Sequence, residues 1–338
     1  MSQPLLVTGT IGIDTILTPS GRADGVRGGS GSFAAVAALL FADRVDAVSI
    51  IGEDFPAHYE AALEAKGVCM NGVERKKGPS FSWTGEYFDN MNKRRTVCAN
   101  DSVMLEWDVH VPEPLRNHPV LVCCCMVPAQ QLKCMEQCPD AALVLSDSMD
   151  KWLRPQPELL DAVISRSHIT MMNEDEAKEY AQASTVLEAG EFLLSKGAAY
   201  AVVKQGEYGA TLLGRDVGGD LGKDDDGAAG KHQPQHQLEH LADEVFAPCV
   251  EDGQIADRCA QHEAAAAEQA EQYLVQGLPD RAALHKGQHD EQQARKQGAQ
   301  PCGHPLLCPA LSPRRCASCG RFSFFLCHLS LQPCLFLP

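Results

Sequence analysis

Four groups of residues in the first two thirds of the chain could bind a polar ligand. They are Asp14, the turn Gly28-Gly29-Ser30, the pair Asn173 and Glu176, and the run Lys204 to Gly209. Glycines adopt backbone angles that other residues avoid, and they let a ligand approach the main chain closely. A carboxylate such as that of Asp14 accepts hydrogen bonds from hydroxyl groups. These residue types therefore indicate a site for a small molecule that carries hydroxyls or phosphate.

The elements that must position these residues alternate between strand and helix. Apolar runs predict strands at 5–8, 45–51, 121–126, 142–146, 169–172 and 199–204, and periodic patterns predict helices at 33–42, 56–66, 129–137 and 158–165. Continuous apolar strands alternating with helices are typical of a parallel sheet that helices cover on both faces. Ligands of such sheets bind beyond the carboxyl ends of the strands. We expect a doubly wound, mostly parallel α/β fold, with Asp14 at the end of the first strand.

Two segments near the glycine turn bear on the site. Ser30 or Ser32 is expected to cap the helix over 33–42, whose free N–H groups would face the ligand. Residues 18–27 read as a polar, turn-rich connection. Residues 80–97 place aromatic and β-branched side chains around polar turns, which predicts a hairpin or small sheet that could act as a lid.

The charge of the chain restricts its partners. A formal net charge of −16 argues against binding to nucleic acid or to an anionic membrane surface, because both attract basic patches. No apolar run reaches the length of a membrane span, and the first residues lack the pattern of a secretory signal. We therefore expect a cytoplasmic protein with a small-molecule partner and neither a nucleic acid nor a membrane partner.

The composition changes sharply after residue 213. Large apolar residues are sparse over 214–300, so this segment is expected to be disordered. Residues 301–338 are rich in Cys, Pro, Leu and Phe, and the abrupt change resembles an out-of-frame translation. Cys316 and Cys319 have the spacing of zinc ligands, but the neighbouring cysteines are irregularly spaced, which favours an accidental cluster.

The ordered set of motifs resembles a known family. Gly28-Gly29-Ser30, Gly52-Glu53-Asp54, Asn173-Glu174-Asp175-Glu176 and Lys204-Gln205-Gly206-Glu207-Tyr208-Gly209 are similar, in order and separation, to the motifs of ribokinase-like (PfkB) carbohydrate kinases. The resemblance covers about residues 4–213. It implies a ribokinase-like domain over 1–213, with the small β lid at about 80–97 and the fold incomplete at its C-terminus. It also implies ATP-dependent phosphorylation of a sugar or nucleoside hydroxyl, with Mg²⁺, and a homodimer formed through the lid.

The resemblance also implies roles for individual residues. Asp14, Gly28 and Gly29 would bind substrate hydroxyls; Asn173, Lys204, Gly206 and Gly209 would bind the nucleotide; Glu176 would hold Mg²⁺ through water. The last role agrees with the chemistry of Mg²⁺, which prefers oxygen ligands and retains several of its waters.

The sequence departs from the family pattern in its catalytic motif. The Gly-Ala-Gly-Asp that would supply the anion hole and the general base is absent, and Gly218-Gly219-Asp220 is the nearest text. Phe33 stands where the family often has Asn, and Lys204-Gln205 replaces the Thr that precedes the nucleotide-loop glycine. No base can be assigned beyond the weak candidate Asp220. We therefore expect this chain to be inactive or impaired.

Other functions remain open. The chain could be a non-catalytic ligand-binding pseudoenzyme or a truncated product. Residues 29–34 also spell G-x-G-x-x-A, and Asp54 follows at the distance that a dinucleotide-dependent oxidoreductase would require. That fingerprint must directly follow a strand. Because the residues before it read as a polar turn, the oxidoreductase is the less favoured alternative.

Overall fold

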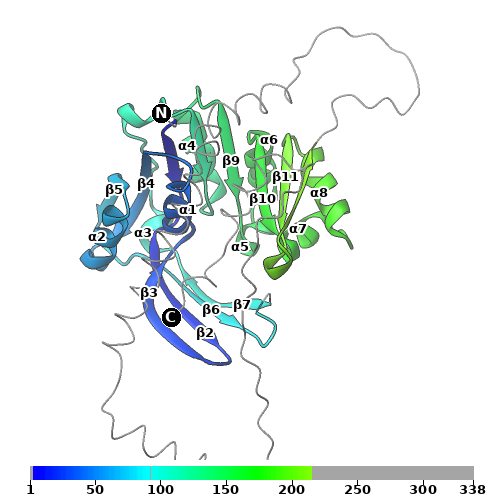
Figure 1. The fold of residues 1–338 in the computed structure, drawn as a ribbon, viewed down its shortest axis with the longest axis horizontal. Coiled ribbons are helices and arrows are strands. Elements are labelled where there is room, and N and C mark those ends of the chain that lie inside the picture. The colour runs from blue at the N-terminus through cyan, green and yellow to red at the C-terminus, as the bar shows by residue number, and fades with distance from the viewer. Residues whose placement is uncertain (1–2, 92, 215–338) are drawn as a thin grey trace, which may run out of the picture. The chain divides into compact units, whose positions relative to one another are not determined.

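The computed structural model describes residues 3–91 and 93–214 of the 338 residues. They form a large and a small sheet with helices packed around the large one (Figure 1). The strands of the large sheet are β1 Leu5–Thr8, β4 Val45–Gly52, β5 Val68–Lys76, β8 Val120–Cys123, β9 Leu143–Asp147, β10 Ile169–Asn173, β11 Tyr200–Lys204 and β12 Ala210–Gly214. The segments 214–300 and 301–338 and the candidate base Asp220 lie outside the described residues, apart from Gly214.

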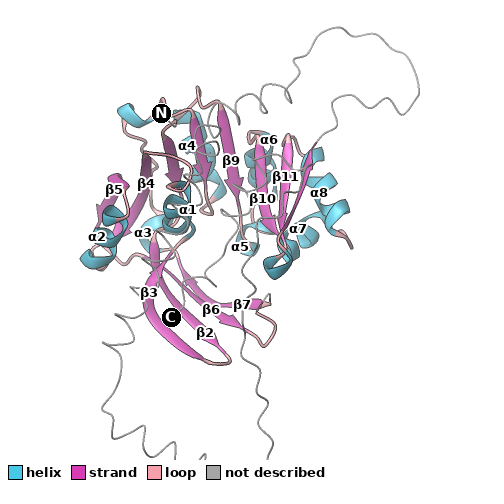
Figure 2. Ribbon diagram, viewed as in Figure 1, coloured by secondary structure: helices cyan, strands magenta, loops and turns pink. Residues whose placement is uncertain are grey.

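The helices follow the strands along the chain (Figure 2). They are α1 Ser30–Ala38, α2 Ala57–Ala65, α3 Ser102–Leu105, α4 Pro128–Gln137, α5 Asp150–Leu153, α6 Pro157–Ser165, α7 Glu174–Ala181 and α8 Val186–Ser195, with the short 3-10 turns η1 Glu113–Leu115 and η2 Gly206–Tyr208. Local signals explain several ends. Gly67 follows α2 with φ 105° and donates its N–H to the carbonyl of Glu64, as expected of a glycine that ends a helix.

The large sheet has the strand order β12-β11-β10-β9-β8-β1-β4-β5, and its pairs are parallel except for β11 with β12. Every residue of β1 and β4 is buried, which means that both faces of the sheet are covered there. The chain leaves β1 toward β4 on one side and later returns to β8 on the other. The expected doubly wound, mostly parallel fold is confirmed, and the carboxyl ends of β1 and β8 mark the point where ligands of such folds bind.

The small sheet corrects the expected extent of the lid. It has four strands in the order β3-β2-β6-β7, with bounds β2 Gly12–Thr18, β3 Gly21–Gly28, β6 Phe81–Tyr87 and β7 Arg94–Asn100. The expectation that 18–27 is a turn-rich connection was wrong. Those residues belong mostly to β3, an edge strand whose polar side chains are largely exposed, so the segment carries no apolar signal. Asp14 consequently lies within β2, not at the end of β1.

The first helix also differs from expectation. It spans Ser30–Ala38, with Gly29 as its N-cap residue and no side-chain cap. The hydroxyl of Ser30 donates to the carbonyl of Cys125 (3.1 Å), and that of Ser32 donates to the carbonyl of Gly28 (2.8 Å). Both serines therefore tie the turn to its surroundings and do not cap the helix. The G-x-G-x-x-A run follows β3 of the small sheet, and not a strand of the parallel sheet, so the geometry does not support a dinucleotide fingerprint.

Among residues 3–91 and 93–214, no helix is both long and apolar enough to cross a membrane.

Candidate functional site

A pocket of about 110 Å³ lies where the carboxyl ends of the large sheet meet the small sheet. Three groups of residues line it. The small sheet provides Asp14, Phe81, Trp83, Tyr87 and Arg94; the turn and helix after β3 provide Gly29, Ser30 and Phe33; and the large sheet and its following turns provide Thr10, Cys125, Asp147, Ser148, Met149, Glu176 and Lys204. The pocket therefore joins four of the residues predicted from the sequence: Asp14, Gly29, Glu176 and Lys204.

Asp14 faces the pocket from β2 with only 9% of its surface exposed. The backbone N–H groups of Gly29 and Trp83 donate hydrogen bonds to its carboxylate, but its Oδ1 has no partner among the described residues. Burial raises the pKa of Asp14 to about 7, and the two N–H groups offset only part of that effect. An unpaired, buried carboxylate oxygen at a pocket is suited to accept a hydrogen bond from a ligand hydroxyl.

The two glycines serve the site through packing. A Cβ on Gly28 would lie 2.0 Å from Oδ2 of Asp14, so the glycine makes room for the carboxylate, and Gly28 itself does not line the pocket. Gly29 has φ 92°, and a Cβ there would lie 2.3 Å from the carbonyl oxygen of Thr10. Both positions thus require glycine whether or not a ligand touches the backbone.

Gly28→Ala tests this arrangement. The added methyl group would push the Asp14 carboxylate from its position, so we expect sugar or nucleoside affinity to fall about 10-fold or more, the loss of roughly one hydrogen bond to a charged group. Gly21→Ala is the matched control on the same strand, because a Cβ at Gly21 meets no atom within 4 Å. Calorimetric titration of both variants checks the prediction, and equal affinities would contradict it.

Two charged residues from neighbouring strand ends form an ion pair in the pocket. Lys204 ends β11 and Asp147 ends β9, and Lys204 Nζ lies 2.9 Å from Asp147 Oδ1. Burial lowers the pKa of Lys204, but the carboxylates of Asp147 and Glu176 more than compensate, so that its pKa is raised overall. Sequence reasoning did not select Asp147, although its position directly after a buried strand was a usable signal.

Glu176 lies in the first turn of α7 with 4% of its side chain exposed. Its Oε2 accepts the backbone N–H of Asn173 (3.0 Å), while Oδ1 of Asn173 accepts the backbone N–H of Glu176 (2.8 Å). This reciprocal pair is a capping box. Burial raises the pKa of Glu176 to about 7, opposed chiefly by Lys204. The amide of Asn173 thus fixes the start of α7, and Asn173 does not line the pocket.

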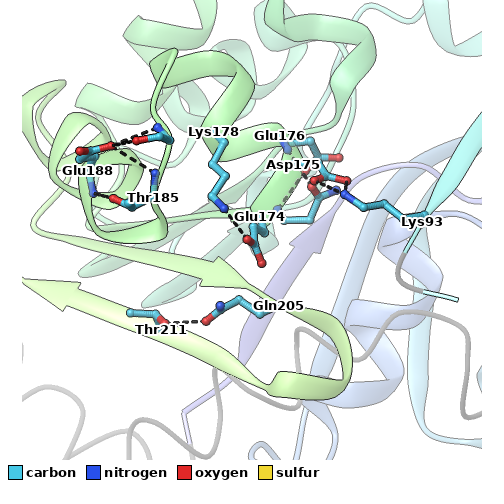
Figure 3. A network of polar contacts seen from close by, with 11 residues as sticks. Lys93, Glu174, Asp175, Glu176, Lys178, Thr185, Glu188, Gln205 and Thr211 are labelled. Atoms are coloured by element: carbon cyan, nitrogen blue, oxygen red, sulfur yellow. Dashed lines mark hydrogen bonds and ion pairs between the residues drawn. The ribbon is translucent and has the colours of Figure 1, made fainter. Parts of the chain in front are cut away.

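The predicted nucleotide loop forms a tight turn beside the pocket. Gly206 and Gly209 have φ 58° and 90°, and the N–H of Gln205 donates to the carbonyl of Gly209 (2.7 Å). Figure 3 shows the Gln205 side chain meeting Thr211 across this hairpin, where the hydroxyl donates at 2.6 Å. Neither glycine lines the pocket.

The small sheet adds residues that sequence reasoning missed. Phe81, Trp83 and Tyr87 give the pocket an aromatic wall, and Trp83 and Tyr87 meet edge to face with ring centroids 6.5 Å apart. Arg94 lies over the Trp83 ring, with its Cζ 5.4 Å from the ring centroid. The alternation of aromatic residues in 80–97 was visible, but which face of each strand points into the pocket depends on pairing with β2.

The donor set suits a hydrated Mg²⁺ ion. The carboxylates of Asp147 and Glu176 both line the pocket, and each influences the pKa of Lys204 through its charge. Mg²⁺ takes oxygen ligands and is commonly held by one or two carboxylates, with waters and phosphate oxygens completing its octahedron. The residues present therefore fit the ion.

Comparisons with known proteins agree with this arrangement. Residues 18–221, more than half of the chain, match the model of the pfkB family of carbohydrate kinases. A cytidine kinase of Thermococcus kodakarensis is 26% identical over 211 residues, which are 62% of this chain and 75% of that protein.

Solved structures share the fold. The ribokinase of Arabidopsis thaliana complexed with ribose and ATP is 17% identical, has a TM-score of 0.53, and is matched over 64% of this chain and 76% of its own. A protein described as a ribokinase II of E. coli, in complex with ATP and Mg²⁺, is 17% identical, has a TM-score of 0.52, and is matched over 63% of this chain and 76% of its own. The fold is therefore ribokinase-like, and the chain belongs to the pfkB family of carbohydrate kinases.

Proposed function

We propose that the pocket binds Mg²⁺ with ATP and a sugar or nucleoside, the ligands of phosphoryl transfer to a substrate hydroxyl, and that this reaction is inactive or impaired in this chain because the Gly-Ala-Gly-Asp motif is absent. The observation that carries this proposal is the buried carboxylate of Asp14, which lines the pocket with one unpaired oxygen. The cations Lys204 and Arg94 line the same pocket and provide positive charge for phosphate.

Substrate binding would use residues of the small sheet together with the turn and helix that follow β3. Oδ1 of Asp14 would accept a hydrogen bond from a substrate hydroxyl, and Gly29 beside it would let the sugar ring approach the main chain. Phe33, Phe81 and Trp83 offer apolar surface for the ring or base. That the T. kodakarensis relative is named a cytidine kinase supports the nucleoside among these substrates.

Nucleotide binding would use the opposite part of the pocket. Lys204, which lines the pocket, would bind phosphate oxygens. Asp147 and Glu176 would hold Mg²⁺ through water. When bound, Mg²⁺ neutralises negative charge on the phosphates. Gly206 and Gly209 would bind the nucleotide through the turn that they shape, and Asn173 would act by fixing Glu176. The complexes of neighbouring folds with ATP, and in one case with Mg²⁺, support this half of the proposal.

A second candidate is ligand binding without turnover. The sequence has no Gly-Ala-Gly-Asp, and Asp220, the weak candidate for the base, lies outside the described residues. A chain that binds both ligands but transfers nothing would be a pseudoenzyme. The cytoplasmic location and the lid-mediated homodimer stay predictions.

Calorimetric titration of the full chain tests the proposed function. We titrate a non-hydrolysable ATP analogue with Mg²⁺, and separately a panel of sugars and nucleosides, into the same preparation. We expect saturable binding of the nucleotide and of at least one panel member. We also expect Asp14→Asn to bind the sugar or nucleoside more weakly than wild type does, and to bind the nucleotide with the same affinity. No binding of any panel member, or a nucleotide affinity that is equal with and without Mg²⁺, would contradict the proposal.

A further inference from the structure

Arg94 is the charged residue of the pocket whose role neither the sequence nor the family assigns here. It stands at the start of β7, and its guanidinium reaches from the small sheet to the first turn of α7. We propose that Arg94, which the small sheet places in the pocket, is an anion-binding residue. Its guanidinium leaves the ion pair with Glu176 when a phosphate group of the ligand binds, and pairs with that phosphate. This inference rests on the proposed function, which supplies the phosphate-bearing ligand.

The side chain of Arg94 is half-buried, and its polar contacts are long. The side chain of Arg94 is only 15% exposed, yet its nearest carboxylate oxygens lie 3.3 Å away in Glu176 and 3.8 Å away in Asp150. Its other polar contact, with the hydroxyl of Thr96, is 3.5 Å long. Close ion pairs between N–H groups and carboxylates have distances of about 2.7–2.9 Å. Arg94 therefore pairs with the buried carboxylate of Glu176, but at a longer distance than a close ion pair.

The neighbouring cation shows the contrast. Lys93 is 56% exposed, and its Nζ lies 2.7 and 2.8 Å from the two carboxylate oxygens of Asp175. Figure 3 shows this side chain directed at the first turn of α7, beside Glu176. The exposed Lys93 thus has two contacts of 2.7 and 2.8 Å, whereas the shortest ion pair of the half-buried Arg94 is the one with Glu176 at 3.3 Å. An oxyanion in the pocket would give Arg94 an anionic partner at a shorter distance.

The chemistry of that anion follows from the geometry. A guanidinium presents parallel N–H groups that match two oxygens of a phosphate. The Cζ of Arg94 also lies over the ring of Trp83, 5.4 Å from its centroid. Lys204 lines the same pocket and could bind another oxygen of the same phosphate chain. A divalent ion at Glu176 would compete with Arg94 for that carboxylate, so binding of metal and phosphate would together break the Arg94–Glu176 contact.

The phosphate could come from either of two ligands. It could be the terminal phosphate of a nucleoside triphosphate, or the phosphate of a phosphorylated sugar or nucleoside. The experiment therefore measures dissociation constants of the full chain, with Mg²⁺, for the β,γ-imido analogue of ATP, for ADP and for cytidine monophosphate. The variants are Arg94→Gln, Arg94→Lys and the matched control Lys93→Gln.

We expect Arg94→Gln to weaken binding of a phosphate ligand about 10- to 100-fold, as loss of a charged hydrogen-bonding partner would. The affinity of Arg94→Lys should lie between those of Arg94→Gln and wild type, because lysine keeps the positive charge but not the two parallel N–H groups. Lys93→Gln should bind as wild type does. A loss confined to the imido analogue identifies the terminal phosphate, and a loss confined to the monophosphate identifies the phosphorylated product. Ligand should also change the fluorescence of Trp83, and Trp83→Phe should remove that change.

Two results would overturn the inference. Equal affinities of wild type and both Arg94 variants for all three ligands would show that Arg94 does not contact phosphate. An equal loss in Lys93→Gln would show that both cations act only by holding the small sheet against α7. Failure of the wild-type chain to bind any nucleotide would instead overturn the proposed function, and this inference with it. Thermal unfolding of each variant confirms that the compared chains are folded, and Arg94→Lys carries the test if Arg94→Gln does not fold.

Discussion

Asp14→Asn is expected to make the chain more stable at pH 8 while weakening its binding of a sugar or nucleoside. The carboxylate is buried in the pocket wall and no cation pairs with it among the described residues, so burial raises its pKa from 3.8 to about 7. At pH 8 the folded chain must hold this group in its charged form. An amide of the same shape avoids that cost, but it accepts a ligand hydroxyl less strongly than a carboxylate does.

The pH dependence has a definite sign. Between pH 4 and pH 7 the folded state keeps the proton on Asp14 while the unfolded state loses it, so the group's contribution to stability is complete below pH 4 and is lost as the pH rises through 7. The full pKa shift corresponds to roughly 4 kcal/mol at pH 8. Glu176 acts in the same direction, since its pKa is also raised to about 7, but it is common to both chains and cancels in the comparison.

Denaturant unfolding of wild type and Asp14→Asn at pH 5 and pH 8 measures this effect. We expect the variant's advantage in free energy of unfolding to grow by about 2–3 kcal/mol between the two pH values. Asp24→Asn is the matched control on the adjacent strand, because Asp24 is exposed, pairs with Arg22, and has a lowered pKa. An advantage that is the same at both pH values would show that Asp14 is not buried as described.

The sequence allowed most of the large sheet to be predicted. The expected strands 5–8, 45–51 and 169–172 agree with β1, β4 and β10 to within one residue at each end. These strands are buried on both faces, so each is a short, continuous apolar run that needs no information from elsewhere in the chain. β5 was not predicted, because Val68–Lys76 alternates buried and exposed residues and ends in a charged run.

The small sheet could not be predicted in the same way. β3 is an exposed edge strand of glycine and charged residues, and it is a strand because it pairs with β2. β2 in turn pairs with β6, a strand that follows it by more than 60 residues along the chain. Such long-range pairing leaves no local pattern. The position of Asp14 inside β2 and the entry of Arg94 into the pocket both depend on it.

Part of the candidate site followed from residue types and part did not. Asp14, Gly29, Glu176 and Lys204 were selected from the sequence and lie together in the pocket. The packing of Gly28 against the Asp14 carboxylate could not be predicted, because it depends on the register between β2 and β3, and the expected role of Gly28 in substrate binding stays a prediction. The ion pairs of Asp147 and Arg94 could not be predicted for a similar reason, although the place of Asp147 at the end of a buried strand was visible in the sequence. Their partners, Lys204 and Glu176, are more than 50 residues away in the chain.

The full chain, incubated with ATP, Mg²⁺ and a panel of sugars and nucleosides, is expected to release ADP no faster than it does without a substrate. The carboxylates of the pocket are already engaged. Asp147 pairs with Lys204, Glu176 caps α7 and contacts Arg94, and Asp14 is held by two backbone N–H groups with one oxygen left for a substrate hydroxyl. The motif that would supply a general base and an anion hole in this family is absent from the sequence.

Each missing component has a large expected effect on rate. Loss of a general base lowers a rate by about 10²- to 10⁴-fold, and loss of one preorganised hydrogen-bond donor by about 10²- to 10³-fold. The two need not multiply, but either brings turnover close to background. A coupled assay for ADP on monodisperse protein measures this, with binding of both ligands confirmed beforehand so that a negative result reports on chemistry and not on affinity. Rapid, substrate-dependent ADP release would contradict the prediction. Asp220→Asn would then test the candidate base: loss of turnover with unchanged substrate affinity assigns the base to Asp220, and unchanged turnover excludes it.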